Sequence, residues 1–158
     1  MEGAPVRQSQ VFMTELVLPN DTNQLGNLLG GRLMHWIDIA AAIAAQRHSG
    51  RVCVTASVDE LNFHDPIKLG EIVTLQASVN RAFRSSMEIG VIVTAQGLAG
   101  RKVRRANNAY LTFVAIDDAG VPVPVPAAIP ETEDEKRRYG EALHRRELRL
   151  RNRLPLSR

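Results

Sequence analysis

The run GRLMHWIDIAAAIAAQR, residues 31–47, decides the fold. Between Leu33 and Ala45 only His35 and Asp38 are polar, so the helix that this run predicts is apolar all round instead of amphipathic. A helix of this kind has to be wrapped by other structure on most of its sides. The remainder of the chain must therefore supply its cover.

Alternating segments on both sides of the helix predict that cover. A first strand is expected over residues 10–18, and four more follow the Ser49-Gly50 stop signal, the last over residues 105–116. Short turns indicate that consecutive strands are antiparallel neighbours. Their alternating positions are Val52, Val54, Ala56 and Val58; Val73, Leu75, Ala77 and Val79; Met87, Ile89, Val91, Val93 and Ala95; and Ala109, Leu111, Phe113 and Ala115. The sequence thus predicts an α+β fold, one curved antiparallel sheet wrapped around a long buried helix, whose partly apolar outer side favours pairing of protomers.

The chain is interpreted as one domain with an appendage. Its 158 residues, 44% of them hydrophobic, suffice for one core, expected over residues 1–120. The repeat VPVPVPAAIP predicts an extended arm over 121–130, because its prolines cannot join a central strand. A charged helical tail is expected over 131–158, with acids before bases as the helix dipole favours. We expect this tail to pack on a neighbouring protomer, with an acidic membrane surface or RNA as the alternatives.

Charge and cysteine content narrow the class of protein. Residues 1–130 contain eleven Lys and Arg and eleven Asp and Glu, so the net charge of +3 lies entirely in the tail. A neutral body argues against a nucleic-acid-binding domain. The single cysteine, Cys53, is typical of a reducing compartment, and neither a signal peptide nor a membrane span is visible. We expect a soluble, cytoplasmic protein.

The chemistry is expected around Asp38, because burying an unpaired carboxylate costs several kcal/mol. Asp38 either forms a structural pair, with His35 one turn earlier or with a loop amide, or acts as a general base or nucleophile. A second element precedes it: Gly30 and Gly31 begin the helix, where free backbone N–H groups can stabilise an oxyanion. Ordinary turn geometry explains a glycine pair equally well, so its value lies in its closeness to Asp38.

Taken together, these residues resemble a known family. The matching positions are Asp21-Thr22-Asn23, Gly26-Asn27, Gly30-Gly31, Met34, Asp38-Ile39-Ala40, Val54-Thr55, Phe63, Asp65-Pro66 and Gly70-Glu71. Over residues 10–120 the chain is similar to cytosolic acyl-CoA thioesterases of the hotdog superfamily, the YciA-like and brain acyl-CoA hydrolase group. The resemblance implies the hotdog fold and hydrolysis of fatty acyl-CoA to free fatty acid and CoA. Leu29 and His64 depart from the family pattern, which bears on acyl-chain preference.

The resemblance also implies a site. Asp38 matches the catalytic carboxylate, as general base or nucleophile, and works with Asn23 and the Gly31 amide of another protomer. Substrate contacts are expected from Gly30 and Thr55. The phosphates of CoA call for basic and hydroxyl groups, for which the candidates are Arg84, Ser85 and Ser86 in one turn and Arg101, Lys102, Arg104 and Arg105 at the last strand; each is equally explained as a solvated charge.

The resemblance further implies a homo-oligomer with a dimer as its active unit, and a trimer of dimers, a hexamer, as the larger assembly. No cofactor is expected beyond the CoA of the substrate, and the scattered His35, His48 and His64 offer no metal-ligand spacing. Two alternatives stay open. One is an acyl-thioester dehydratase or hydratase that pairs His35 with Asp38, and the other is a non-catalytic acyl-CoA-binding module.

Overall fold

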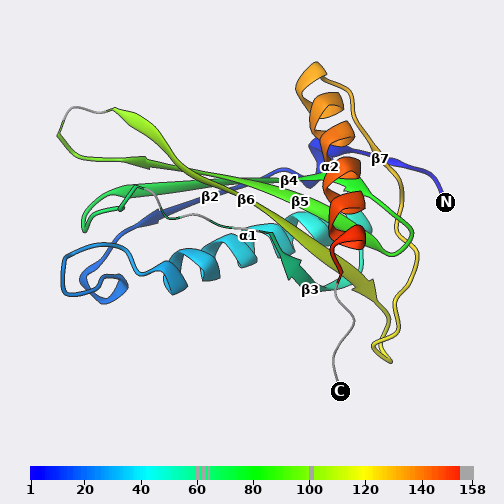
Figure 1. Ribbon diagram of the computed structural model, residues 1–158, viewed down its shortest axis with the longest axis horizontal. Helices are drawn as coiled ribbons and strands as arrows, with labels where there is room; N and C mark the ends of the chain where they lie inside the picture. The colour runs from blue at the N-terminus through cyan, green and yellow to red at the C-terminus, as the bar shows by residue number, and fades with distance from the viewer. Residues whose placement is uncertain (60, 62, 64, 100–101, 154–158) are drawn as a thin grey trace.

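The computed structural model describes residues 1–59, 61, 63, 65–99 and 102–153. A long helix, α1 (Gly30–Ser49), lies along one face of a curved five-stranded antiparallel sheet. A second helix, α2 (Glu133–Arg151), packs on the opposite face of the sheet and lies steeply across the strands (Figure 1). This arrangement confirms the α+β fold predicted from the change of periodicity along the chain.

The five strands are β2 (Val11–Leu16), β3 (Val52–Val58), β4 (Ile72–Ala82), β5 (Ser86–Gln96) and β6 (Val103–Ile116), and their order in the sheet is β2-β4-β5-β6-β3. β4, β5 and β6 are consecutive antiparallel neighbours, as predicted. The same prediction is wrong for β3 and β4. β3 pairs with β6 at one edge, because the 13 residues between β3 and β4 are too many for a tight hairpin and carry the chain across to the other side of the sheet.

The core lies between α1 and the sheet. The predicted alternating positions of β4, β5 and β6 face α1, and Leu75, Ile89 and Leu111 are each at most 1% exposed. On the helix, Ala40 and Ala44 are completely buried, and their small side chains let the strands approach the helix closely. The apolar helix and the alternating strands therefore cover one another.

One side of α1 is left uncovered in the single protomer. His35, Ile39 and Gln46 are exposed along the helix, so the expectation that the helix is wrapped on most sides is only partly met. The apolar side of β3 is uncovered as well, with Val52 62% and Val54 44% exposed. Five strands curl around only part of the helix, which leaves an apolar sheet edge of the kind that pairs with another chain.

The N-terminal segment pairs with the segment that precedes α2 beside the sheet. β1 (Ala4–Pro5) and β7 (Ala128–Ile129) form a short parallel pair, and the 3₁₀ helix η1 (Val6–Ser9) follows β1. The arm over 121–130 is extended up to β7, and the Val125 N–H donates to the Arg84 carbonyl oxygen at 2.9 Å. The arm thus returns the chain along the sheet to the start of α2.

α2 packs on the sheet of its own chain. Thr132 caps the helix by accepting a hydrogen bond from the Glu135 N–H at 3.1 Å. Arg145 forms a bidentate pair with Glu88 of β5, at 2.6 and 3.0 Å, and Glu88 is completely buried. The expected solvent-exposed tail helix is therefore docked by ionic contacts, while its packing on a neighbouring protomer stays a prediction. Among the described residues, no helix is long and apolar enough to cross a membrane.

Candidate active site

Asp38 lies in the middle of α1, and its carboxylate is bound by Thr55 of β3. The Thr55 hydroxyl donates to Asp38 Oδ1 at 2.7 Å. A β-bulge interrupts the pairing of β3 with β6 between Thr55 and Ser57, and bulges of this kind redirect side chains next to functional sites. Asp38 is only half-buried, and its hydrogen bond is with Thr55, not His35. From the sequence, Thr55 is expected to contact the substrate. Its contact with Asp38 is visible only in the structure, where β3 lies beside α1.

The N-terminus of α1 presents free hydrogen-bond donors. The side chain of the N-cap residue, Leu29, accepts no hydrogen bond, and its carbonyl oxygen is taken by the Arg32 and Leu33 N–H groups. In the described part of the chain the Gly30 and Gly31 N–H groups have no acceptor, as is usual for a first helical turn. A methyl group added at Gly31 would meet nothing within 4 Å. Space is therefore open at the side of Gly31 where a side chain would lie, next to a backbone N–H group that has no acceptor.

The loop before α1 holds Asn23 rigidly. Its Oδ1 accepts hydrogen bonds from the N–H groups of Leu25, at 2.9 Å, and Asn27, at 3.2 Å. With the carbonyl of the side chain occupied, the exposed Nδ2 group is the part of Asn23 that can serve a ligand, as a donor. The sequence does not show that the carbonyl oxygen of the Asn23 side chain is already hydrogen-bonded within its own loop.

Asp21 fastens this loop to the helix. The buried Asp21 carboxylate accepts from the Leu18 N–H at 2.9 Å and forms an ion pair with Arg32, in the first turn of α1, at 3.2 Å. From the sequence, Asp21 is one position of the family motif and has no predicted role of its own. The contact fixes the position of Asn23 relative to the free amides of α1.

A second anchor lies behind the loop. Glu71 accepts from the Lys68 N–H at 2.6 Å and from Arg104 Nη2 at 2.9 Å. The hydrogen bond from Arg104 lowers the pKa of the Glu71 carboxyl against the opposing effect of burial, and the bond from the Lys68 N–H lowers it further. Arg104, expected near the phosphates of CoA, is thus engaged in holding the chain between β3 and β4.

Within one protomer the two halves of the site stay apart. Gly31 and Asp38 are seven residues apart on the same face of α1, which separates them by about 10 Å along the axis. That distance is too large for both to bind one carbonyl group and its attacking water. The structure therefore joins Asp38 with Thr55 but separates Asp38 from the Gly31 amide, and it holds Asn23 in the loop that leads into α1.

The expected CoA-binding clusters lie at opposite ends of the β5–β6 hairpin. Ser86 is paired with Val114 and Gln96 with Val103, so Ser86 and Lys102 are separated by about 30 Å of strand. Ser86 also accepts a hydrogen bond from Arg146 of α2, at 3.3 Å, on the face away from α1. Arg84 is exposed in the β4–β5 turn, where the Ser85 carbonyl oxygen accepts from the Ala115 N–H.

One protomer therefore does not gather both clusters at Asp38. Two residues named from the sequence, Arg101 and His64, lie outside the described residues.

Comparison with known proteins identifies relatives of this chain. A family model for the thioesterase superfamily matches residues 25–99. The chain is 44% identical to mouse acyl-coenzyme A thioesterase 11 over 94% of its own length, but it spans only 25% of that protein. It is 42% identical to YkhA of Bacillus subtilis, named an acyl-CoA thioester hydrolase, over 88% of its own length and 81% of that protein.

Solved structures of acyl-CoA thioesterases and hydrolases are also similar to this chain. A hexameric acyl-CoA thioesterase has a TM-score of 0.92 and 38% identity, covering 96% of this chain and 97% of the other. The acyl-CoA hydrolase of Staphylococcus aureus, solved with butyryl-CoA and CoA, has a TM-score of 0.87 and 41% identity, covering 92% and 89%. Further structures of the S. aureus enzyme carry alanine in place of a single Asp, Asn or Thr.

Proposed function

This chain belongs to the acyl-CoA thioester hydrolases of the thioesterase superfamily, and on that premise we propose that it hydrolyses fatty acyl-CoA to a free fatty acid and CoA. The observation that carries the proposal is the Asp38 carboxylate, fixed by Thr55 beside an uncovered sheet edge. In the reaction, either water activated by Asp38 or the Asp38 carboxylate itself bonds to the thioester carbonyl carbon. The carbon–sulfur bond then breaks, and the CoA sulfur leaves and takes up a proton. Where the carboxylate is the nucleophile, water then hydrolyses the resulting anhydride.

We assign the acid–base or nucleophilic role to Asp38. Asn23 Nδ2 and the Gly31 N–H serve as donors to the carbonyl oxygen as negative charge develops on it. Thr55 is a positioning residue, because it contacts Asp38 and holds the carboxylate in one orientation. The residues replaced in the S. aureus structures, an Asn, an Asp and a Thr, are 15 and 17 residues apart in that order, the separations that Asn23, Asp38 and Thr55 also have. This agreement supports the three assignments.

A dimer would complete the site. Two copies related by a two-fold axis and paired through the β3 edge would give the unpaired side of β3 a partner strand and would cover Ile39 of α1, which is exposed in the protomer. With the two α1 helices antiparallel, the Gly31 amide and Asn23 of one copy can approach Asp38 of the other. The 10 Å gap within a protomer is thereby removed, and each dimer has two equivalent sites.

We further infer that three such dimers assemble into a hexamer. A second apolar surface supports this, at the other sheet edge, where Phe12 and Leu16 of β2 and Ile72 of β4 are 65%, 52% and 41% exposed on the face that carries α2. The hexameric relative is consistent with a further interface of this kind. A charged replacement, Phe12→Glu, should reduce the hexamer to dimers without abolishing the dimer, as measured by mass in solution.

The remaining inferences concern the cofactor, the cellular location and the binding partners. We expect the substrate to bring CoA with it, so that the enzyme needs no separate cofactor. Relatives named as cytosolic support a cytosolic location. The neutral charge of residues 1–130 supports the absence of nucleic acid among the partners.

Complementation between two inactive variants tests the shared site. Asp38→Asn and Asn23→Ala are each expected to lose measurable release of free thiol from acyl-CoA. When the two variants are co-expressed, half of the dimers are mixed, and one site in each mixed dimer carries both native residues. Activity should therefore return to about one quarter of the wild-type value for random assembly into two-fold dimers.

The control co-expresses Asp38→Asn with the double variant Asp38→Asn/Asn23→Ala, which should stay inactive. If the mixed assembly of the two single variants is equally inactive, Asp38 and Asn23 act within one protomer and the dimer arrangement is wrong. Wild type that binds acyl-CoA but releases no thiol would instead favour a binding module. The dehydratase alternative requires that His35→Ala abolish turnover, whereas the Asp38–Thr55 contact predicts that activity survives this change.

A further inference from the structure

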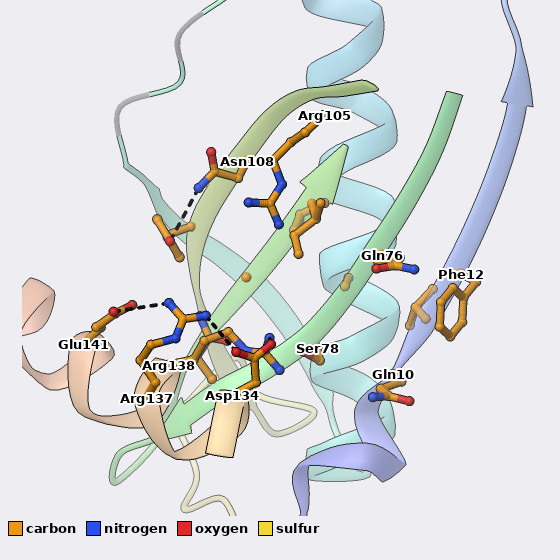
Figure 2. Close-up of a pocket in the computed structure, with 17 residues that line it drawn as sticks. Gln10, Phe12, Gln76, Ser78, Arg105, Asn108, Asp134, Arg137, Arg138 and Glu141 are labelled. Atoms are coloured by element: carbon orange, nitrogen blue, oxygen red, sulfur yellow. Dashed lines mark hydrogen bonds and ion pairs between the residues drawn. The ribbon is translucent and has the colours of Figure 1, made fainter. Parts of the chain in front are cut away.

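A cavity of about 260 Å³ lies on the α2 side of the sheet, away from Asp38 (Figure 2). β4 and β5 form its floor, α2 lines one side, and β6 lines another. Polar side chains surround it, and Figure 2 shows Gln76 and Ser78 on the floor with Arg105 and Asn108 at the β6 side. The sheet separates this cavity from the proposed active site, so the cavity needs an explanation of its own.

Gly90 of β5 is one of the residues that line the cavity. It is paired with Ser78 on one side and with Tyr110 on the other, and it contributes no side chain of its own to this face of the sheet. A methyl group added at Gly90 would lie 2.7 Å from Asn80 Nδ2. The glycine therefore makes room for the Asn80 side chain, which donates to Glu88 Oε1 at 3.0 Å.

Asn80 is incompletely satisfied. Its residue surface is only 2% exposed, and Asn80 contributes to the lining of the cavity. The bond to Glu88 occupies Nδ2, whereas Oδ1 has no donor among the described residues. Buried amide oxygens are nearly always hydrogen-bonded in native proteins. Oδ1 has almost no accessible surface, so it lies beneath the floor of the cavity and does not itself meet a ligand there.

The cavity also carries excess positive charge. Its lining includes three arginines, Arg105, Arg137 and Arg138, but only two acids. On α2 the acids are engaged, since Asp134 binds Arg137 at 3.1 Å and Arg138 at 3.5 Å. Arg105 has no carboxylate partner within the described part of the chain. A guanidinium group of this kind is suited to a carboxylate or a phosphate, which it can bind through two parallel hydrogen bonds.

We propose that this cavity binds a small organic anion, a phosphate ester or a carboxylate, that also carries a hydroxyl or amino donor. Its anionic group binds Arg105, and its hydroxyl or amino groups meet the polar side chains of Gln76 and Ser78 on the floor of the cavity. The cavity is too small for a large ligand and lies on the sheet face opposite Asp38, so the proposal stands independently of thioester hydrolysis.

Isothermal titration of the full-length protein tests the proposal. The probes are ribose 5-phosphate and gluconate, which pair hydroxyl donors with a phosphate and a carboxylate respectively, and the references are ribose and inorganic phosphate. At least one of the two probes is expected to bind more tightly than both references. The comparison of the two probes decides between the two anionic groups.

Arg105→Gln should weaken the bound probe by about tenfold or more, because the exposed arginine supplies the charge-assisted contact and its loss leaves the sheet intact. The matched control is Arg153→Gln, which removes the same charge from outside the cavity and should leave the affinity unchanged. The proposal is overturned if neither probe binds better than ribose, or if Arg105→Gln and Arg153→Gln have equal effects. Inorganic phosphate binding as tightly as ribose 5-phosphate would refute the role of Gln76 and Ser78 in binding the hydroxyl groups.

Discussion

Replacing Thr55 with valine removes one hydroxyl group and keeps the branched shape of the side chain at the β3 bulge. In the wild type this hydroxyl donates to Asp38 Oδ1 at 2.7 Å, a short hydrogen bond to a charged acceptor. Thr55→Val therefore leaves Asp38 in place without the contact that orients it. The fold should be unaffected, because Thr55 is exposed in the protomer and valine is a favourable strand residue.

The size of the effect depends on whether a second copy covers the site. A solvent-exposed hydrogen bond contributes about 0.5–1.5 kcal/mol, which corresponds to a roughly 2- to 12-fold loss of kcat. A hydrogen bond to a charge that is shielded from water contributes about 1.5–3 kcal/mol, or roughly 10- to 150-fold. Because the proposed dimer covers the β3 edge, we expect a loss in the higher range, with KM nearly unchanged.

The assay is the release of free thiol from acyl-CoA at saturating substrate, with the oligomeric mass checked in parallel. Thr14→Val is the matched control, since Thr14 is an exposed strand residue on β2, at the opposite edge of the sheet. The control should keep wild-type kcat. If Thr55→Val retains kcat within about twofold of wild type in an intact dimer, Thr55 does not position Asp38 and the reasoning is refuted.

Three further predictions concern the glycines and the two buried ion pairs. Gly31→Ala should not lower Tm, since a methyl group there meets nothing within 4 Å, but it should reduce kcat at least about tenfold by placing that methyl group beside the amide assigned to the substrate carbonyl. Gly140→Ala, in an equally open position on α2, should add about 0.5–1 kcal/mol of stability and leave kcat unchanged. Glu71→Gln should cost about 1.5–3 kcal/mol of unfolding free energy at pH 7. The pKa of Glu71 is lowered in the folded protein, so the stability difference between wild type and variant is fully present above the ordinary pKa of 4.5. The difference shrinks as the pH falls through the pKa that Glu71 has in the folded protein. Urea unfolding at pH 7 and at pH 3.5 measures this change. Arg145→Met, which removes the main partner of the buried Glu88, should cost about 3 kcal/mol in guanidinium unfolding, and adding Glu88→Leu should recover most of the loss.

The sequence is most informative where burial is decided locally. The alanine-rich run before Gln46 can only be a covered helix, and the period-2 patterns of β4, β5 and β6 fix the face that meets α1. The short turns between these three strands indicate their pairing. Asp38 stands out for the same reason, as a charge within an otherwise apolar helix. These features depend on neighbours within a few residues, so periodicity reveals them.

The parts that the sequence does not show depend on distant partners. Nothing near Val52 indicates that β3 pairs with β6 at one edge, because this pairing follows from the route that the chain takes after β3. The contact between Thr55 and Asp38 requires that same register. The docking of α2 is also hidden, since the helix meets the sheet through arginines and Ala142 instead of a stripe of large apolar residues.

The pairing of β3 with β6 also sets an order of events during synthesis. Between the end of β3 at Val58 and the start of β6 at Val103 lie 44 residues, which a ribosome adds in a few seconds. β3 therefore emerges from the ribosome 44 residues ahead of β6, and for that interval the strand that completes its side of the sheet is not yet available. A nascent chain thus displays its apolar edge before it can close it. Where two ribosomes translate one messenger side by side, each exposed β3 has another within reach, so contact between subunits can precede completion of either sheet.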